Sequence, residues 1–283
     1  MYNIEYKDIK KNPLFLQECI TDNGFVIVKN IFENKFIEKL NREIESLKLL
    51  RKVKVNQFAI ANAFGNYRKF SKLLDEDRIK SVLKSYFNNK KFGFWGHSDI
   101  LVNVYSPWHK DDGGEDIKTN YFRFDSIKKE DAVIIKCALY LQDHDYDRNG
   151  LWVIPKSHRE YFPGKLKPFN TKIKKNDLLL FDARLTHRGS QITFLPYFTE
   201  NKFLFKLANK VNSKITQYIS KLFCLKLSKN RNAIFFTVGE LNKTSHSFGV
   251  NMVENAKNKG YPISSLDIDL KKKLNKEGIF TYP

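Results

Sequence analysis

The sequence has 283 residues, of which 42% are hydrophobic and which include 24 Phe and 13 Tyr. This composition can form a substantial core and excludes a disordered or low-complexity chain. No run approaches the roughly 18 consecutive apolar residues of a membrane-spanning helix, and the first residues lack the layout of a secretory signal, so we expect a cytoplasmic protein. Three widely spaced cysteines form no C-x-x-C pair and are expected to be reduced, buried thiols: Cys19, Cys137 and Cys224.

The chain is strongly basic, with 50 Lys and Arg against 31 Asp and Glu and a formal net charge of +19. Such a charge can attract nucleic acid, anionic small molecules or membrane headgroups. Here the lysines are spread along the whole chain, and no helix-turn-helix, RRM or zinc-finger pattern accompanies them. We therefore expect a small, anionic substrate rather than nucleic acid.

The first part of the chain, residues 1–92, is predicted to be a mainly helical flank with one early strand. Asn23-Gly24 forms a turn before the short apolar strand 25–28. Asn34 can cap a helix whose apolar residues share one face, and a second amphipathic helix is predicted over 70–86.

From residue 93 the pattern changes to short β-type runs bounded by Gly, Pro, Asn or Asp. Over 93–250 this pattern predicts the core of a mainly β domain with flanking helices, either an antiparallel sandwich or a jelly roll. A C-terminal tail follows over 251–283, and the whole chain, 1–283, is predicted to be one domain. The predicted strands are 99–105, 133–141, 151–155, 177–181 and 233–238.

A helical insert at about 200–228 interrupts the strands. Within 203–227, apolar residues recur at helical spacing, while the lysines lie mostly elsewhere. We expect the apolar stripe to pack on the sheet and the lysines to be solvated; a lid over the site and a peripheral contact with a membrane surface are the alternatives. The stripe consists of Leu207, Val211, Ile215, Ile219 and Leu222.

A His-x-Asp triplet follows the predicted strand 99–105. If the backbone is extended there, His109 and Asp111 point to the same face, because side chains alternate with period two. A third ligand would have to come from a neighbouring strand, and His187, which follows the apolar run 177–181, is the candidate. Two histidines and one carboxylate on one face of an iron leave three open positions, as in non-haem Fe(II) oxygenases, and these suit a bidentate 2-oxo acid and O2.

A 2-oxo acid with a second carboxylate at its far end needs a fixed cationic partner. Arginine is best suited, because its planar fork makes two charge-assisted hydrogen bonds. Arg231 opens the predicted strand 233–238 and is the next strand-borne arginine after His187. Arg188 is the alternative, although its side chain should point away from that of its neighbour His187 in an extended backbone.

Together these features resemble the phytanoyl-CoA dioxygenase family, whose members are Fe(II)- and 2-oxoglutarate-dependent oxygenases. The resemblance implies a double-stranded β-helix, the cupin-like jelly roll, over most of the chain from about Gly24 to Gly239. It rests on the opening strand 24–28, the W-H-x-D motif that ends at Asp111, the stretch 149–158, the segment 177–187 and the strand that Arg231 opens.

The resemblance also implies roles for individual residues. His109, Asp111 and His187 would bind the iron and carry catalysis, and Arg231 would hold the distal carboxylate of 2-oxoglutarate. Asn103 is similar in placement to an amide that helps to hold the co-substrate in some members; the alternative is an ordinary strand asparagine.

Two departures from the family pattern are evident. The co-substrate arginine usually follows the distal histidine closely, whereas 44 positions separate His187 from Arg231. Either the insert is an excursion that returns the chain to the expected strand, or Arg231 is the wrong choice. In addition, Lys156 stands where the family commonly has glycine, and because a positive φ is costly for lysine, we expect the turn to differ locally.

The sequence therefore predicts a dioxygenase that hydroxylates an unactivated C–H bond and releases succinate and CO2 from 2-oxoglutarate. Because Asp111 fills the carboxylate position, which halogenating relatives leave vacant for a halide, hydroxylation is favoured over halogenation. The alternatives are a catalytically inactive jelly-roll binding protein and an oxygenase that acts on nucleic acid.

Overall fold

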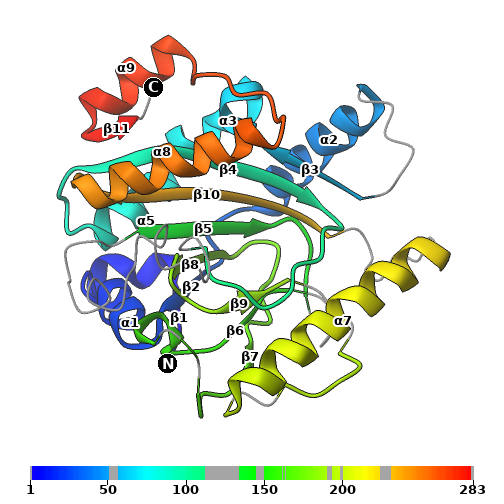
Figure 1. The fold of residues 1–283 in the computed structure, drawn as a ribbon. Coiled ribbons are helices and arrows are strands. Elements are labelled where there is room, and N and C mark those ends of the chain that lie inside the picture. Colours follow the sequence, from blue (N-terminus) through cyan, green and yellow to red (C-terminus); the bar gives the residue numbers. More distant parts are fainter. Residues whose placement is uncertain are drawn as a thin grey trace.

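The computed structural model describes residues 2–50, 57–111, 134–144, 150–160, 162, 164–189, 193–197, 200–223 and 231–281. Within these ranges two sheets form the centre of the molecule (Figure 1). The larger sheet has the order β1-β2-β8-β5-β10-β4-β11, with β3 paired to β4, and the smaller has the order β7-β6-β9. The strands are β1 (Asn3–Glu5), β2 (Phe25–Lys29), β3 (Phe58–Ala61), β4 (Phe92–Val102), β5 (Ile134–Tyr140), β6 (Trp152–Val153), β7 (Phe169–Asn170), β8 (Leu178–Asp182), β9 (His187–Arg188), β10 (Asn232–Glu240) and β11 (Ile279–Thr281).

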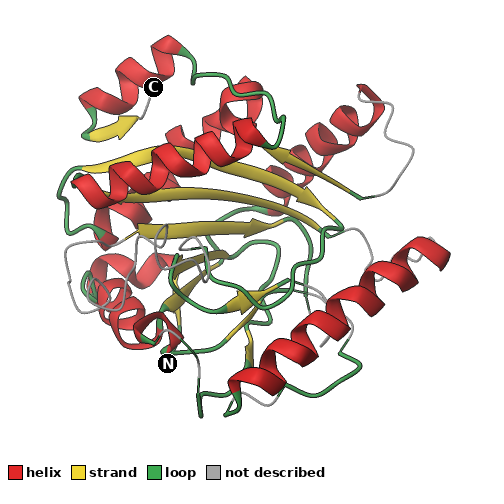
Figure 2. Ribbon diagram, in the orientation of Figure 1, coloured by secondary structure: helices red, strands yellow, loops and turns green. Residues whose placement is uncertain are grey.

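Helices lie on the outside of these strand layers (Figure 2). They are η1 (Tyr6–Lys11), α1 (Phe15–Asn23), α2 (Asn34–Leu50), α3 (Ala63–Asn66), α4 (Arg68–Ser71), η2 (Lys72–Asp75), α5 (Asp77–Tyr86), η3 (Ser157–Arg159), α7 (Lys202–Phe223), α8 (Lys243–Asn258) and α9 (Ile268–Lys276). No helix among the described residues is both long enough and apolar enough to cross a membrane.

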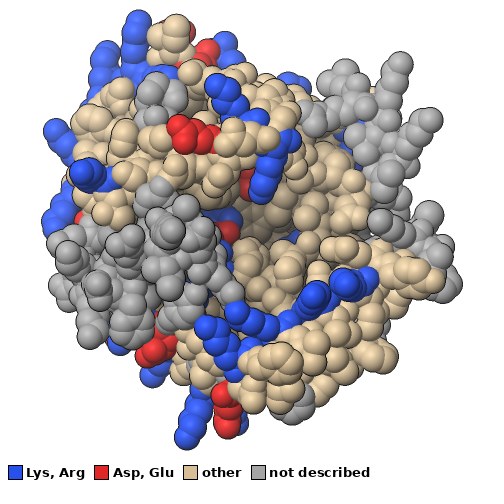
Figure 3. All heavy atoms as spheres, viewed as in Figure 1, with Lys and Arg blue, Asp and Glu red and all other residues tan. Residues whose placement is uncertain are grey.

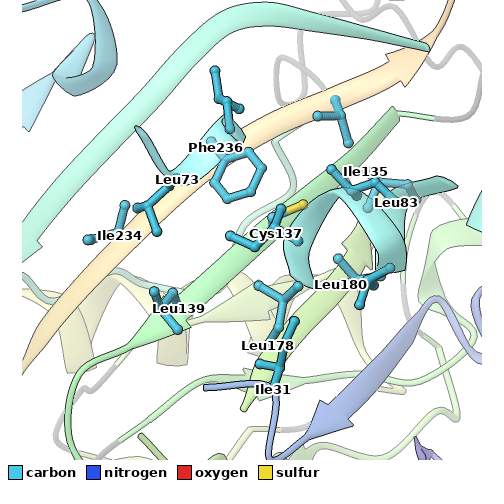
Figure 4. Packing of buried hydrophobic residues seen from close by; sticks show 14 of the residues in the cluster. Ile31, Leu73, Leu83, Ile135, Cys137, Leu139, Leu178, Leu180, Ile234 and Phe236 are labelled. Atoms are coloured by element: carbon cyan, nitrogen blue, oxygen red, sulfur yellow. The ribbon is translucent and has the colours of Figure 1, made fainter. Parts of the chain in front are cut away.

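The alternation of side chains along the central strands divides the interior into two cores. On β5, Ile135, Cys137 and Leu139 face the helices and pack there with residues of η2, α5 and β8 (Figure 4). Ala138 and Tyr140, on the opposite face of β5, belong to a second core between the two sheets. Because both faces are covered, the sequence of β5 is apolar at every position except Lys136.

The two opposed sheets form the predicted jelly roll, so the expected fold class is confirmed. The antiparallel pairing of β10 with both β4 and β5 brings residue 231, just before β10, to the open end of the two sheets. β9 pairs with β6 and also forms a bridge to residue 109. This end of the jelly roll therefore gathers segments from four distant parts of the chain.

Short edge strands correct two sequence-based expectations. Besides the expected strand β2, residues 1–92 contain β1, parallel to β2, and β3, antiparallel to β4. The expected C-terminal tail, 251–283, instead holds the end of α8, the helix α9 and the strand β11, which pairs in parallel with β4. Strands of three or four residues are too short to show a period in the sequence.

The helical insert is present as α7, but it packs through a different face from the one expected. Phe205, Ala208 and Thr216 are buried, whereas Leu207 of the expected stripe is 43% exposed. The side chains of Val211, Ile215 and Ile219 are half-buried, and that of Leu222 lies outside the described residues. Helical periodicity located the helix, but could not show which of two adjacent stripes contacts the protein.

Cys19 and Cys137 are buried thiols, as expected, and burial raises the pKa of each. Cys224 lies outside the described residues.

Lys156 adopts the left-handed conformation that the sequence suggested it would avoid, with φ 69° and ψ −8°. Its backbone N–H donates to the carbonyl of Asn23 at 2.9 Å, and its own carbonyl accepts from Arg159 N–H at 3.2 Å. The expectation of a locally different turn is therefore wrong, because these bonds hold the backbone in the geometry that favours glycine.

Replacing Lys156 with glycine is expected to raise the free energy of unfolding by about 1 kcal/mol, since the left-handed conformation costs a side-chain-bearing residue roughly that much. Urea unfolding measures the change. Lys165→Gly is the matched control, because Lys165 has no positive φ, and it should lower stability instead. A decrease in both variants would contradict the interpretation of strain at Lys156.

Candidate metal and co-substrate site

His109 and His187 lie directly opposite each other at the open end of the jelly roll. The N–H of each residue donates to the carbonyl of the other at 2.9 Å, forming an isolated antiparallel bridge. Cross-strand neighbours project to the same face of a sheet, and the centroids of the two imidazole rings are 4.3 Å apart. The structure thus brings together two histidines that are 78 positions apart in the sequence.

Asp111 completes this cluster. Its backbone N–H donates to the carbonyl of Ala183 at 2.9 Å, which holds the segment after His109 against the end of β8. Its carboxylate oxygens lie 3.6 Å from Nε2 of His109 and 3.4 Å from Nε2 of His187. The candidate ligand atoms of the three residues all lie within 4.8 Å of one another, so one metal ion could contact all of them.

Backbone carbonyls fix the orientation of both imidazoles. Nδ1 of His109 lies 2.7 Å from the carbonyl of Pro107, and Nδ1 of His187 lies 2.9 Å from the carbonyl of Leu185. A carbonyl can only accept, so Nδ1 carries the hydrogen in each neutral ring and Nε2 presents a lone pair. Both lone pairs are directed towards Asp111, and this donor set suits a first-row divalent metal.

Electrostatics keep this cluster in the form that binds metal. Burial alone would raise the pKa of Asp111, but Lys136 and His187 outweigh it and hold that pKa well below its usual range. Burial, followed by the proximity of His109, lowers the pKa of His187 to about 3. At neutral pH the site therefore presents an ionised carboxylate and an uncharged His187.

Lys136, which pairs with Asp111, was not among the site residues predicted from the sequence. It lies on β5 with 10% of its side chain exposed, and its Nζ is 2.7 Å from Oδ2 of Asp111. The signal was a single lysine within the apolar run of β5, because lysines are almost never buried without a partner. The sequence alone does not identify the partner, because Asp111 lies in a segment 25 residues away.

Arg231 is buried beside the metal cluster. A Cβ atom added to Gly189, two residues after His187, would lie 3.0 Å from Nη2 of Arg231. Nη2 also lies 3.3 Å from the hydroxyl of Tyr140, and Nη1 donates to the carbonyl of Val104. The 44-residue separation is thus an excursion through α7 that returns the chain to the site.

Asn103 acts on the backbone of Arg231. Its Oδ1 accepts from Arg231 N–H at 2.7 Å, and its own N–H donates to the carbonyl of Arg231 at 2.8 Å. Asn103 has φ 53°, a left-handed conformation that asparagine tolerates better than most residues. It therefore fixes the point at which β10 begins.

Arg188 points away from the cluster, as the alternation of side chains predicts. Its guanidinium lies 5.3 Å from the ring of Trp108, 5.1 Å from Trp152 and 5.3 Å from Tyr197. These contacts place it in the aromatic cluster that α7 covers, on the far face of the small sheet.

The site is open on the side of His109, whose side chain is 37% exposed, against 11% for Asp111 and 5% for His187. Figure 3 shows a hollow in this face of the molecule, between α7 and the large sheet, with basic and acidic atoms inside it. The exposed side of His109 is therefore the side from which a small molecule can reach the cluster.

A buried histidine, His144, lies behind Arg231. The side-chain oxygen of Gln142 accepts from Asn232 N–H at 2.7 Å, which directs the Gln142 amide group towards Nε2 of His144 at 2.6 Å. Nε2 must therefore accept, and the ring must be neutral. Burial, followed by the charge of Arg231, lowers the pKa of His144 to about 3.

This geometry predicts a loss of stability in acid. The unfolded chain binds a proton at His144 below pH 6.5 and the folded chain does not, so stability is retained above pH 6.5 and falls towards pH 3. Between pH 7 and pH 5 the wild type should lose about 2 kcal/mol more than His144→Leu. Urea unfolding at both pH values measures this difference, and equal losses would contradict the assignment of a neutral His144.

Comparison with known proteins identifies the family of the chain. The profile of the family described as phytanoyl-CoA dioxygenase (PhyH) matches residues 20–193, more than half of the chain. The chain belongs to the phytanoyl-CoA dioxygenase family. Membership confirms the expected enzyme class, an iron- and 2-oxoglutarate-dependent oxygenase, and its two cofactors. No curated protein matches the sequence.

Solved structures show the same fold at low sequence identity. HygX from Streptomyces hygroscopicus, with nickel and 2-oxoglutarate bound, has a TM-score of 0.55 and 13% identity over 80% of this chain and 86% of its own. The epimerase SnoN from nogalamycin biosynthesis has a TM-score of 0.53 and 12% identity over 82% of this chain and 84% of its own. The carbocyclase SnoK, also from nogalamycin biosynthesis, has a TM-score of 0.54 and 10% identity over 85% of this chain and 88% of its own.

Proposed function

We propose that this dioxygenase binds Fe(II) through His109, Asp111 and His187 and hydroxylates an unactivated C–H bond of a small, anionic substrate. The observation that supports this proposal is the cluster itself, in which two imidazole lone pairs and an ionised carboxylate face one point beside a buried arginine. When bound, the iron and 2-oxoglutarate supply the oxidising chemistry, with release of succinate and CO2.

Arg231 is proposed to bind the distal carboxylate of 2-oxoglutarate. Its guanidinium is fixed beside the Tyr140 hydroxyl and next to Gly189, just after β9, so two donors face the same small region. A guanidinium and a phenol hydroxyl can together satisfy both oxygens of a carboxylate. Asn103 then acts as a positioning residue, because its Oδ1 accepts from the backbone N–H of Arg231.

Lys136 is proposed to position Asp111. A buried carboxylate that loses its proton needs compensating charge, and the Lys136 ammonium at 2.7 Å supplies it. It also keeps Asp111 ionised and ready to bind a cation.

The proposal of an anionic substrate is supported by charge. The chain carries a net charge of +19, and basic side chains line the edge of the hollow that α7 forms (Figure 3). Such a surface raises the local concentration of anions and accelerates their association. The similar solved structures are consistent with a small-molecule substrate, since HygX has been solved with hygromycin B bound.

The test is formation of succinate from 2-oxoglutarate with Fe(II) and O2, together with the anaerobic absorption spectrum of the protein with both cofactors. A charge-transfer band is expected only when iron and 2-oxoglutarate bind together. Absence of the band would favour a jelly-roll binding protein without redox chemistry. Product analysis then separates hydroxylation from the epimerisation or ring closure named for SnoN and SnoK.

Replacing Asn103 with alanine is expected to weaken 2-oxoglutarate binding about tenfold, because Arg231 loses the hydrogen bond that fixes its backbone, worth about 1 kcal/mol, together with part of its alignment. The anaerobic absorption titration gives the Kd. Asn103→Asp keeps the acceptor oxygen and should restore most of the affinity. If Asn103→Asp binds as weakly as Asn103→Ala, the amide contacts the co-substrate itself.

A further inference from the structure

Helix α7 is held on the protein by small and polar residues. Asn209 accepts from Trp108 N–H and donates to the Trp108 carbonyl, both at 2.9 Å. Asn212 makes three bonds of 2.8 Å, accepting from the N–H groups of Phe194 and Leu195 and donating to the Leu195 carbonyl. These contacts fix the helix next to His109, so its orientation is set by the body of the protein.

This anchoring leaves a row of apolar side chains facing outward. The exposed fraction is 72% for Phe203, 43% for Leu207 and 64% for Tyr218, and Phe194, just before the helix, is 67% exposed. The row follows one stripe of the helix at spacings of three and four residues. It consists of the exposed residues Leu204, Leu207 and Tyr218 with the half-buried Val211 and Ile215 between them, and the exposed Phe203 lies beside it at the start of the helix.

A row of lysines runs parallel to these apolar residues. Lys202, Lys206, Lys210 and Lys214 are all exposed and are each four residues apart, so they form one line along the helix. The sequence of α7 contains a fifth lysine, Lys221, and neither Asp nor Glu. Figure 3 shows basic side chains along the edge of α7 that faces the hollow.

We propose that α7 docks the protein on an anionic lipid surface. Its apolar row would enter the boundary between headgroups and acyl chains, and its lysines would contact anionic headgroups. Charge complementarity selects this occupant, because a helix with five lysines and no acidic residue attracts a negative surface. The parallel apolar row favours a membrane over nucleic acid, which offers no apolar layer for Phe203 or Leu207.

Docking through α7 would also place the metal site close to the lipid. The helix borders the hollow, and Asn209 ties it to the backbone of Trp108, the residue before His109. Substrate could then enter from the membrane surface. This proposal goes beyond the proposed function and does not depend on the reaction catalysed.

The experiment is flotation of the full chain with phosphatidylcholine vesicles that contain or lack phosphatidylserine. We expect binding only to vesicles with phosphatidylserine, and weaker binding at higher salt. In Lys210→Gln/Lys214→Gln the partition coefficient should fall about fivefold per lysine. In Phe203→Ser/Tyr218→Ser it should fall at least tenfold, because two aromatic side chains no longer insert.

Matched controls lie on other parts of the molecule. Lys272→Gln/Lys276→Gln removes the same charge from α9, far from α7 in Figure 1, and Leu49→Ser/Ile268→Ser removes two exposed apolar side chains. Both controls should bind vesicles as the wild type does. The proposal is overturned if phosphatidylserine does not promote binding, if controls and α7 variants behave alike, or if the α7 lysines support binding to an oligonucleotide but not to vesicles.

Failure here can be told apart from failure of the proposed function. The α7 variants leave His109, Asp111, His187 and Arg231 unchanged, so the anaerobic spectrum with iron and 2-oxoglutarate reports on the site alone. A protein that binds both cofactors but no vesicles would retain the enzymatic proposal and refute the docking surface.

Discussion

Replacing Asp111 with alanine is expected to abolish metal binding and to lower succinate formation about a thousandfold or more. The variant keeps both imidazoles but loses the charged ligand, which removes several kcal/mol of interaction with a divalent cation. It also removes the carboxylate that lies 2.7 Å from Nζ of Lys136 in the wild type. The unpaired ammonium then repels the incoming metal ion. Calorimetry with Co(II) or Ni(II) as probes measures the affinity, and succinate formation measures turnover.

The loss should be specific to this carboxylate. Asp99, on β4, is a half-buried carboxylate whose partner is His97, with Nε2 3.0 Å from its Oδ2, and it lies outside the ligand cluster. Asp99→Asn is therefore expected to bind the probe metals as the wild type does. If Asp99→Asn loses the metal and Asp111→Ala keeps it, the ligand set is wrong.

Removal of Lys136 together with Asp111 distinguishes the effect of an unpaired buried charge on stability from the effect of a lost ligand on metal binding. In the metal-free protein, Asp111→Ala leaves a buried ammonium unpaired, and breaking a buried ion pair costs about 3 to 5 kcal/mol. The double variant Asp111→Ala/Lys136→Met removes both charges and should recover most of that stability without recovering metal affinity. Urea unfolding and metal titration together distinguish a folding defect from loss of a ligand.

The sequence predicted the metal cluster because each part had its own local signal. The period-two alternation placed His109 and Asp111 on one face, and the apolar run before His187 marked the strand that precedes it. Arg231 was predicted in the same way, from its place at the start of an apolar strand. The local signals did not specify the pairings among these segments, which the resemblance to a known family supplied.

The parts that the sequence did not predict depend on contacts between strands. Lys136 is evident in the sequence as the charged residue of the otherwise apolar strand β5, but its pairing with Asp111 depends on how the two sheets come together. Lys156 keeps a positive φ because neighbouring hydrogen bonds impose it. The packing face of α7 was mispredicted because Asn209 and Asn212, polar residues that the apolar pattern ignores, anchor the helix.

Arg231→Gln is expected to raise the Kd for 2-oxoglutarate by roughly a hundredfold or more. The glutamine has no charge and no fork, so two charge-assisted hydrogen bonds of about 1.5 to 3 kcal/mol each are lost. The KM for 2-oxoglutarate should rise with the Kd, while metal binding stays close to that of the wild type, because Arg231 does not contact Asp111 or the histidines. The anaerobic absorption titration gives the Kd directly.

Two further variants make this test specific to the guanidinium. Arg231→Lys keeps the charge but not the planar fork, so its Kd should fall between those of the wild type and Arg231→Gln. Arg188→Gln removes the other arginine near His187, which lies among Trp108, Trp152 and Tyr197 on the far face of the sheet. It should lower stability through lost aromatic contacts and leave 2-oxoglutarate binding unchanged. The reverse pattern, with 2-oxoglutarate affinity lost in Arg188→Gln and kept in Arg231→Gln, would show that the excursion through α7 returns the wrong residue to the site.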